Sequence, residues 1–266
     1  MAKRPISRSP SKRASAAHPE LRLFRLPGLP EIQLGDDLPG RIADAARRAR
    51  IAFESGDILV IAQKIISKAE GALVRLATIQ PSPQALALAD RLKKDPRAVE
   101  VVLQQSRRIV RSDHVLIAET RHGFVCANAG VDHSNVPGED VVTLLPRDPD
   151  LSAKKLAGAL RQLTGKRIAV LISDTFGRPW RLGLTDVAIG AYGVPVLHDL
   201  RGTRDRHRKL LTATVLAVAD ELASAAGLLM RKSEGSPAIL IRGYRYKPSS
   251  DPAARIIRPA AEDLFR

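Results

Sequence analysis

The chain has 266 residues, of which 43 are Lys or Arg and 28 are Asp or Glu, so its formal net charge is +15. Apolar residues make up 44% of the sequence, which is normal for a globular core and excludes a wholly disordered protein. The single cysteine, Cys126, excludes an intrachain disulfide and is expected to be a small core residue. No apolar run is long enough for a transmembrane helix or a secretory signal, so we expect a cytoplasmic protein without a membrane partner.

Residues 1–20 differ in composition from the rest of the chain. They are rich in Lys, Arg, Ser and Pro, which predicts a disordered basic arm. Residues 21–250 are expected to form one enzyme domain, followed by a C-terminal tail at 251–266. The basic pI, near 10.6, raises the alternative of a nucleic-acid-binding protein. Aromatic residues, at 3%, are too few for a stacking platform, and no zinc-finger or RNP-like motif occurs, so nucleic acid is disfavoured as a partner.

Hydrophobic spacing and turn residues predict the elements in chain order. Strands are expected at 21–25, 58–62, 72–79, 108–111, 115–119, 124–127, 141–145, 167–172, 185–190, 194–197 and 237–241. Helices are expected at 38–53, 83–94, 96–106, 153–163 and 208–230, with Asp150 or Ser152 as the cap of the fourth. Because strands and helices alternate irregularly, the expected fold class is α/β in the mixed, α+β sense, with no Rossmann unit. A P-loop motif is also missing from the sequence.

Three polar clusters carry the chemistry. Asp174 and Thr175 follow the apolar strand 167–172, where their oxygens suit Mg²⁺ or Mn²⁺ or form a plain turn. Asp132 lies in a second small-residue segment, 128–135, which is either the other half of a metal site or an Asx-type turn. Lys64 and Lys68 are one helical turn apart and could neutralise a triphosphate, although residue type alone favours a solvated helix face.

Eight segments together resemble one family, the coenzyme F420:L-glutamate ligases or F420-0 gamma-glutamyl ligases. The resemblance runs from about Leu23 to Tyr244 and keeps the order of the family's segments. The segments are Leu29-Pro30-Glu31-Ile32, Ile66–Gly71, Asn128–Asn135, Leu163–Arg167, Ser173–Pro179, Ala188–Gly190, Ala219–Leu222 and Leu228–Met230.

The resemblance implies a GTP-dependent amide ligase that adds L-glutamate to coenzyme F420-0. GTP would activate the acceptor as an acyl phosphate and leave as GDP and phosphate, and some members add further gamma-linked glutamates. The family fold is a mixed α/β arrangement that forms an intertwined homodimer and uses Mg²⁺ or Mn²⁺ together with a monovalent cation such as K⁺. The alternatives are a ligase of the same fold that acts on another acidic acceptor, and the nucleic-acid-binding protein considered above.

The resemblance also implies site residues. Catalytic roles are expected for Lys68, Asp132 and Asp174, and metal ligation for Asp132, Asp174 and Thr175. The family's nucleotide contacts fall on Leu29, Pro30, Glu31, Ile32, Gln63, Lys64, Lys68, Asn135, Met230, Arg231, Lys232, Ser233, Glu234, Gly235 and Ser236.

The chain departs from the family pattern in two places, at Lys232 and at the pair Gln63-Lys64. Lys232 stands where some members have an acidic metal ligand, and a charged lysine has no lone pair to offer. A backbone carbonyl, Glu234 or water would then have to serve as the metal ligand instead. Gln63 and Lys64 stand where hydroxyl residues occur in some members. Candidates for binding the acidic substrates are Arg178, Arg181, Arg201 and Arg204.

Overall fold

The computed structural model describes residues 20–134, 138, 140–230 and 235–263. The α-helices of this part of the chain are α1 (Leu38–Arg48), α2 (Gln63–Ala69), α3 (Pro83–Leu92), α4 (Pro96–Gln105), α5 (Pro149–Thr164) and α6 (Val218–Met230). Short 3-10 helices lie at Leu76–Thr78 (η1), Asn128–Gly130 (η2), Ala253–Ile256 (η3) and Ala260–Glu262 (η4). The mixed α/β class is confirmed, and none of the described helices is long and apolar enough to cross a membrane.

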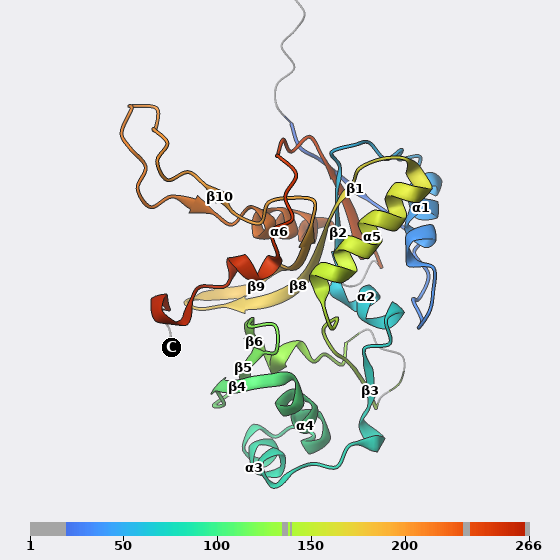
Figure 1. Cartoon of the computed structure of the whole chain (residues 1–266). Helices are drawn as coiled ribbons and strands as arrows, with labels where there is room; N and C mark the ends of the chain where they lie inside the picture. Colours follow the sequence, from blue (N-terminus) through green and yellow to red (C-terminus); the bar gives the residue numbers. More distant parts are fainter. Residues whose placement is uncertain (1–19, 135–137, 139, 231–234, 264–266) are drawn as a thin grey trace, which may run out of the picture.

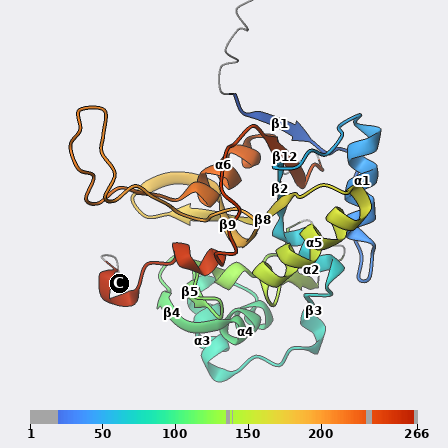
Figure 2. The same ribbon diagram turned by 45° about the horizontal axis from the view of Figure 1, so that its top comes forward.

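A five-stranded sheet organises the larger core, in the order β1-β12-β2-β8-β9. Its strands are β1 (Arg22–Arg25), β12 (Ala238–Arg242), β2 (Ile58–Ala62), β8 (Ala169–Arg178) and β9 (Arg181–Tyr192). Only β2 and β8 pair in parallel, and the other neighbours are antiparallel. Helices α1 and α5 cover one face and α6 the other, as two orientations show (Figure 1, Figure 2). Strands β2 and β8 are therefore apolar on both faces, with Ile58–Ile61 and Val170–Ile172 fully buried.

A second, smaller core lies below this sheet in Figure 1. It contains α3, α4 and a three-stranded sheet of β4 (Ser106–Arg111), β5 (Ile117–Thr120) and β6 (Val125–Ala127). Its buried residues include Val99, Val102 and Leu116. The pair β3 (Leu73–Arg75) and β7 (Val141–Thr143) joins it to the rest of the chain. Because Asp132 follows η2 of this smaller unit, the packing of the two cores decides where that carboxylate lies.

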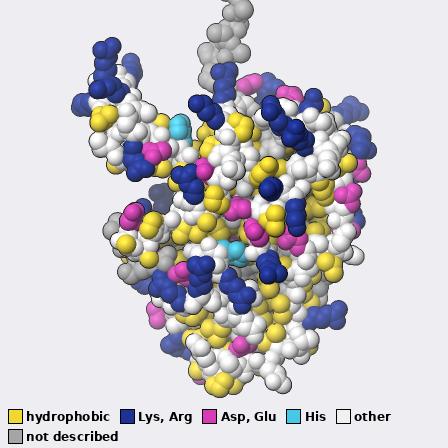
Figure 3. Space-filling view, viewed as in Figure 1, with side chains coloured by type: hydrophobic (Ala, Val, Ile, Leu, Met, Phe, Trp, Pro, Cys, Tyr) yellow, Lys and Arg dark blue, Asp and Glu magenta, His cyan; other side chains and the backbone are white. Residues whose placement is uncertain are grey.

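A narrow projection is formed by the antiparallel pair β10 (His198–Asp199) and β11 (Val215–Leu216) and the segment between them (Figure 1). Figure 3 shows Lys and Arg side chains at its tip and scattered over the rest of that face, without one continuous basic stripe. The expected basic arm, apart from residue 20, lies outside the described residues. In the expected tail, Ala253 is buried, and Ile256 and Ile257 pack against the larger core.

Several predicted elements are wrong in extent. The helix expected at 208–230 begins only at Val218, because Arg208 has a left-handed φ of 64° and the following segment is rich in β-branched residues. The strand expected at 194–197 does not form, and β10 starts at His198. The helix expected at 38–53 ends at Arg48.

Two further errors concern the ends of elements. The helix expected at 153–163 starts at Pro149 and is capped by Asp148, whose side chain accepts from the backbone N–H of Leu151 at 2.9 Å, rather than by Asp150 or Ser152. The strand expected at 72–79 forms only at β3, followed by η1.

Candidate active site

A cavity of about 480 Å³ opens where β2 ends and its parallel pairing with β8 stops, at Ala62 and Ser173. The loop before α1, the start of α2, the hairpin β8–β9, the end of α6 and the segment before β12 all contribute to its wall. The lining residues are Leu29, Pro30, Glu31, Ile32, Ala62, Gln63, Lys64, Ile65, Lys68, Asp132, Ser173, Asp174, Thr175, Asp186, Gly227, Met230, Gly235, Ser236 and Pro237. The carboxyl ends of adjacent parallel strands are a common place for ligand sites in α/β proteins.

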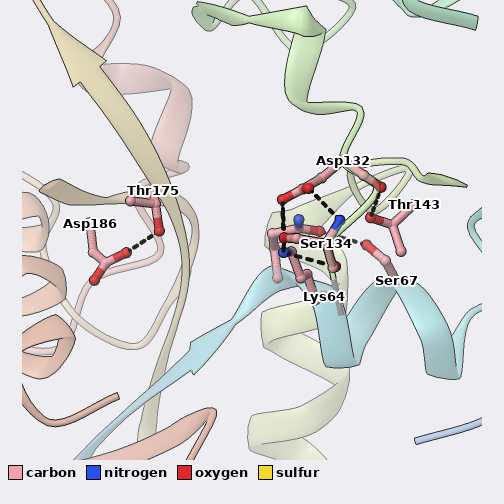
Figure 4. A network of polar contacts seen from close by, with 8 residues as sticks. Lys64, Ser67, Asp132, Ser134, Thr143, Thr175 and Asp186 are labelled. Atoms are coloured by element: carbon pink, nitrogen blue, oxygen red, sulfur yellow. Dashed lines mark hydrogen bonds and ion pairs between the residues drawn. The ribbon is translucent and has the colours of Figure 1, made fainter. Parts of the chain in front are cut away.

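Asp132 and Lys64 form an ion pair on one side of this cavity (Figure 4). Lys64 Nζ lies 2.7 Å from Asp132 Oδ2 and also donates to the backbone carbonyl of Ser134 at 3.1 Å. The backbone N–H of Ser134 donates to Asp132 Oδ1 at 2.7 Å. Lys64 and the Ser134 N–H together keep the pKa of Asp132 below its usual value, although its burial acts in the opposite direction. Asp132 is therefore held ionised, with its orientation fixed.

Lys68 is buried in the cavity and does not lie on a solvated face of α2. It is only 5% exposed, and its Nζ contacts Glu31 of the loop before α1. Gln63, in the first turn of α2, is 1% exposed and accepts a hydrogen bond from Ser67 Oγ at 2.8 Å. Its Nε2 is buried without a hydrogen-bond partner among the described residues. Helix α2 thus directs one amide and two ammonium groups to one wall.

The pKa of Asp174 is raised well above its usual value. Burial, together with the nearby charges of Asp132 and Asp186, raises its pKa to about 6, while the backbone N–H of Thr175 and the charge of Lys64 act to lower it. Thr175, the next residue, donates its hydroxyl proton to Asp186 Oδ1 at 2.7 Å. Figure 4 shows this Thr175–Asp186 pair on the β8–β9 hairpin, apart from the network around Asp132.

The charges of the cavity are incompletely balanced. Lys64 is paired with Asp132 and Lys68 with Glu31, whereas no lysine or arginine of the described lining pairs with Asp174 or Asp186. An anionic ligand here would meet two carboxylates without a neutralising partner unless cations accompanied it. Within the described residues no three His, Cys, Asp or Glu side chains are close enough to hold a metal ion by themselves.

The comparison with known proteins identifies the family. The sequence profile described as F420-0:Gamma-glutamyl ligase matches residues 28–243. This chain belongs to the F420-0:gamma-glutamyl ligase family. It is 46% identical over 250 residues to the Coenzyme F420:L-glutamate ligase of Methanothermobacter thermautotrophicus, covering 92% of this chain and 99% of the relative. The protein of the same name from Methanopyrus kandleri is 48% identical over 256 residues, which cover 93% and 98% of the two chains.

The structure brings most of the expected site residues of this family member into the cavity. They are Leu29, Pro30, Glu31, Ile32, Gln63, Lys64, Lys68, Asp132, Asp174, Thr175, Met230, Gly235 and Ser236. The other expected nucleotide contacts, Asn135 and Arg231, Lys232, Ser233 and Glu234, lie outside the described residues. Arg178, Arg181, Arg201 and Arg204, the candidates for acidic substrates, do not line the described cavity. Arg201 instead pairs with Asp199 at 2.6 Å.

One local expectation about the site is wrong. Asp174 and Thr175 do not form a turn after the strand: β8 continues to Arg178 and pairs with β9. The hairpin bend comes later, at Trp180, which has a φ of 62°. Sequence reasoning also missed Asp186, whose position opposite Thr175 depends on the register of this hairpin. The only signal in the sequence was a carboxylate inside an otherwise apolar strand, at 185–190.

Proposed function

We propose that this family member is a GTP-dependent amide ligase that joins L-glutamate to the carboxylate of coenzyme F420-0 and releases GDP and phosphate. The observation that carries the proposal is one cavity in which two lysines meet four carboxylates, one of them in the 29–32 loop. Such a site suits a polyphosphate with its bound cations. The lysines would bind phosphate oxygens, and the carboxylates would bind the cations. The names of the relatives supply the acceptor and the amino acid.

The reaction needs an activated acceptor, because a carboxylate does not react with an amine at neutral pH. An oxygen of the acceptor carboxylate attacks the γ-phosphorus of GTP, and the bond to the β-γ bridging oxygen breaks, so that GDP leaves. The glutamate nitrogen then attacks the acyl carbon, and phosphate leaves with the former carboxylate oxygen. The amine loses one proton in forming the amide. The enzyme's task is to hold three anionic reactants in line and to offset their charge.

The donor set fits the divalent cation that the family implies. Asp132, Asp174 and Thr175 offer hard oxygen atoms, which Mg²⁺ and Mn²⁺ prefer, and phosphate oxygens commonly complete such sites. When bound, the ion would neutralise charge on the transferred phosphoryl group. Lys64 favours the ionised form of Asp132, which is the form that binds a cation. A monovalent cation such as K⁺ is part of the same proposal.

The remaining residues would bind and orient the nucleotide. Lys68 and Lys64, which line the cavity, would contact phosphate oxygens, and the loop Leu29–Ile32 would contact the nucleoside. The buried Nε2 of Gln63, which has no hydrogen-bond acceptor in the described part of the chain, would donate to an oxygen atom of the nucleotide. We assign Asn135 and the Met230–Ser236 segment to nucleotide binding as well. Because Lys232 cannot act as the metal ligand found at its position in some members, Glu234, a backbone carbonyl or water would take that role.

We propose a homodimer as the active form. Strands β1 and β9 are the two edges of the described five-stranded sheet, and an edge strand favours association with another chain. Light scattering at micromolar concentration should give the mass of two chains. A monomer mass would contradict this part of the proposal.

Isotope transfer tests the activation step directly. F420-0 labelled with ¹⁸O in its carboxylate is incubated with the enzyme, GTP, Mn²⁺ and L-glutamate, and the released phosphate is analysed by mass spectrometry. One ¹⁸O atom per amide bond should appear in phosphate. Amide formation with unlabelled phosphate would refute the acyl-phosphate route.

A further inference from the structure

The β8–β9 hairpin places Thr175 directly opposite Asp186. The two residues are cross-strand partners in the antiparallel register, so their side chains point to the same face of the sheet. The Thr175 hydroxyl donates to Asp186 Oδ1 at 2.7 Å. Both residues line the cavity, close to the end of α6.

The direction of this hydrogen bond limits what Thr175 can do. An ionised carboxylate has only acceptors, so the one hydroxyl proton of Thr175 is committed to Asp186. The hydroxyl oxygen then has only lone pairs to offer to a ligand. Lone pairs bind a cation or an N–H donor, but they cannot donate to a phosphate oxygen.

Helix α6 fixes Asp186 from its other side. Ser224 Oγ donates to the backbone carbonyl of Asp186 at 2.8 Å, and Asp220 Oδ1 accepts from the backbone N–H of Ala188 at 2.9 Å. The carboxylate itself lies against Gly227: a Cβ atom on that glycine would be 1.9 Å from Asp186 Oδ2. Gly227 therefore provides the space in which this carboxylate can reach Thr175.

We infer that Asp186 is a positioning residue, which acts through Thr175 by holding its hydroxyl as a lone-pair ligand for a cation in the cavity, and that Gly227 is required for this placement. The inference rests on the proposed function, because the cation it concerns is the one expected to accompany the nucleotide. Neither Asp186 nor Gly227 is among the residues assigned to catalysis, metal ligation or nucleotide binding under the proposed function. Partners that orient a metal ligand in this way typically change metal affinity by about 10–100-fold when removed.

A double-mutant cycle on Thr175 and Asp186 tests the inference without relying on turnover. Mn²⁺ binding is measured from the loss of the free-ion electron paramagnetic resonance signal, in the presence of GDP and without F420-0. The variants are Thr175→Val, Asp186→Leu, the double variant and Asp186→Asn, each checked for folding by its thermal transition.

If Asp186 acts through Thr175, Asp186→Leu weakens Mn²⁺ binding about 10–100-fold, and the double variant is no weaker than Thr175→Val alone. Asp186→Asn retains a carbonyl acceptor for the hydroxyl and should lose less than Asp186→Leu. Additive losses in the cycle, or wild-type affinity of Asp186→Leu, would overturn the inference. An equal loss for Asn and Leu would also overturn it, because charge rather than the hydrogen bond would then matter.

Gly227→Ala gives a second route that leaves Asp186 and Thr175 unchanged, and Gly158→Ala is its matched control. Both glycines lie within helices, so both gain helix propensity as alanine, but a Cβ at Gly158 meets nothing within 4 Å. Gly227→Ala should weaken Mn²⁺ binding as Asp186→Leu does, whereas Gly158→Ala should bind like wild type. Equal binding by the two alanine variants would refute the role of Gly227. Wild-type protein that binds no Mn²⁺ with GDP would instead refute the cation part of the proposed function itself.

Discussion

Replacing Asp174 by Asn should stabilise this protein when no divalent cation is present. The pKa of Asp174 is raised from 3.8 to about 6 by burial and by the charges of Asp132 and Asp186. The folded state therefore disfavours the ionised form, and above pH 6 that form lowers the stability of the native protein. Asn removes the charge, while its side-chain oxygen can still accept from the backbone N–H of Thr175.

The size of the effect follows from linkage between protonation and folding. A shift of about two pKa units corresponds to about 3 kcal/mol at pH 8, at about 1.4 kcal/mol per unit. Between pH 4 and 6 the folded protein binds more protons at Asp174 than the unfolded chain, so wild-type stability falls as the pH rises through this window. The advantage of Asp174→Asn should accordingly grow from about half its full value at pH 5 to a plateau above pH 7.

Urea unfolding in EDTA at pH 5 and pH 8 measures this difference, with Asp113→Asn as the control at an exposed carboxylate. The same variant should lose the stabilisation that Mn²⁺ with GDP gives to the wild type, because ligand binding stabilises only the state that binds. An Asp174→Asn protein that is no more stable than wild type at pH 8 would refute the reasoning about this carboxylate. A stability gain that is larger at pH 5 than at pH 8 would also contradict it.

Three further predictions concern other parts of the chain. Lys64→Met removes the partner of Asp132 and should reduce ligase turnover about 10²–10³-fold. Lys93→Met, at a side chain that is 82% exposed, should leave turnover unchanged. Equal activities of the two variants would contradict the role of Lys64. Burial raises the pKa of Cys126 to about 12, so iodoacetamide at pH 8 should label it only after unfolding, and rapid labelling of the native protein would be contrary evidence. Deleting residues 1–17, which are rich in Lys, Arg and Ser and contain few large apolar side chains, should leave turnover within a few-fold, and complete loss of activity would show that the segment contributes to the site.

The sequence predicted best those features that depend on local pattern. Apolar runs placed β2 and the first part of β8, and prolines placed the starts of α3 and α4. The resemblance to the family predicted that Lys68, Asp132 and Asp174 belong to one site, and all three line one cavity. Residue type alone had favoured a solvated helix face for Lys68, which is buried.

Features set by pairing partners escaped prediction. β8 runs on through Asp174 because β9 supplies hydrogen bonds to it, and Asp186 faces Thr175 because of the register of that hairpin. Neither fact is written in the spacing of residues along one strand. The start of the helix expected at 208–230 was wrong for a related reason. Apolar residues continue at helical intervals into the segment that contains β11, but that segment pairs as a strand, and the helix begins only at Val218.

The central claim is tested most directly by product analysis. Purified protein is incubated with F420-0, L-glutamate and Mn²⁺, with GTP in one series and ATP in another. The mass of the coenzyme is measured by mass spectrometry, and the nucleoside diphosphate and phosphate released are quantified. We expect the coenzyme to gain glutamyl residues with GTP, with one GDP and one phosphate released for each amide bond. Unmodified F420-0 in the presence of all substrates, from protein shown to be folded, would contradict it.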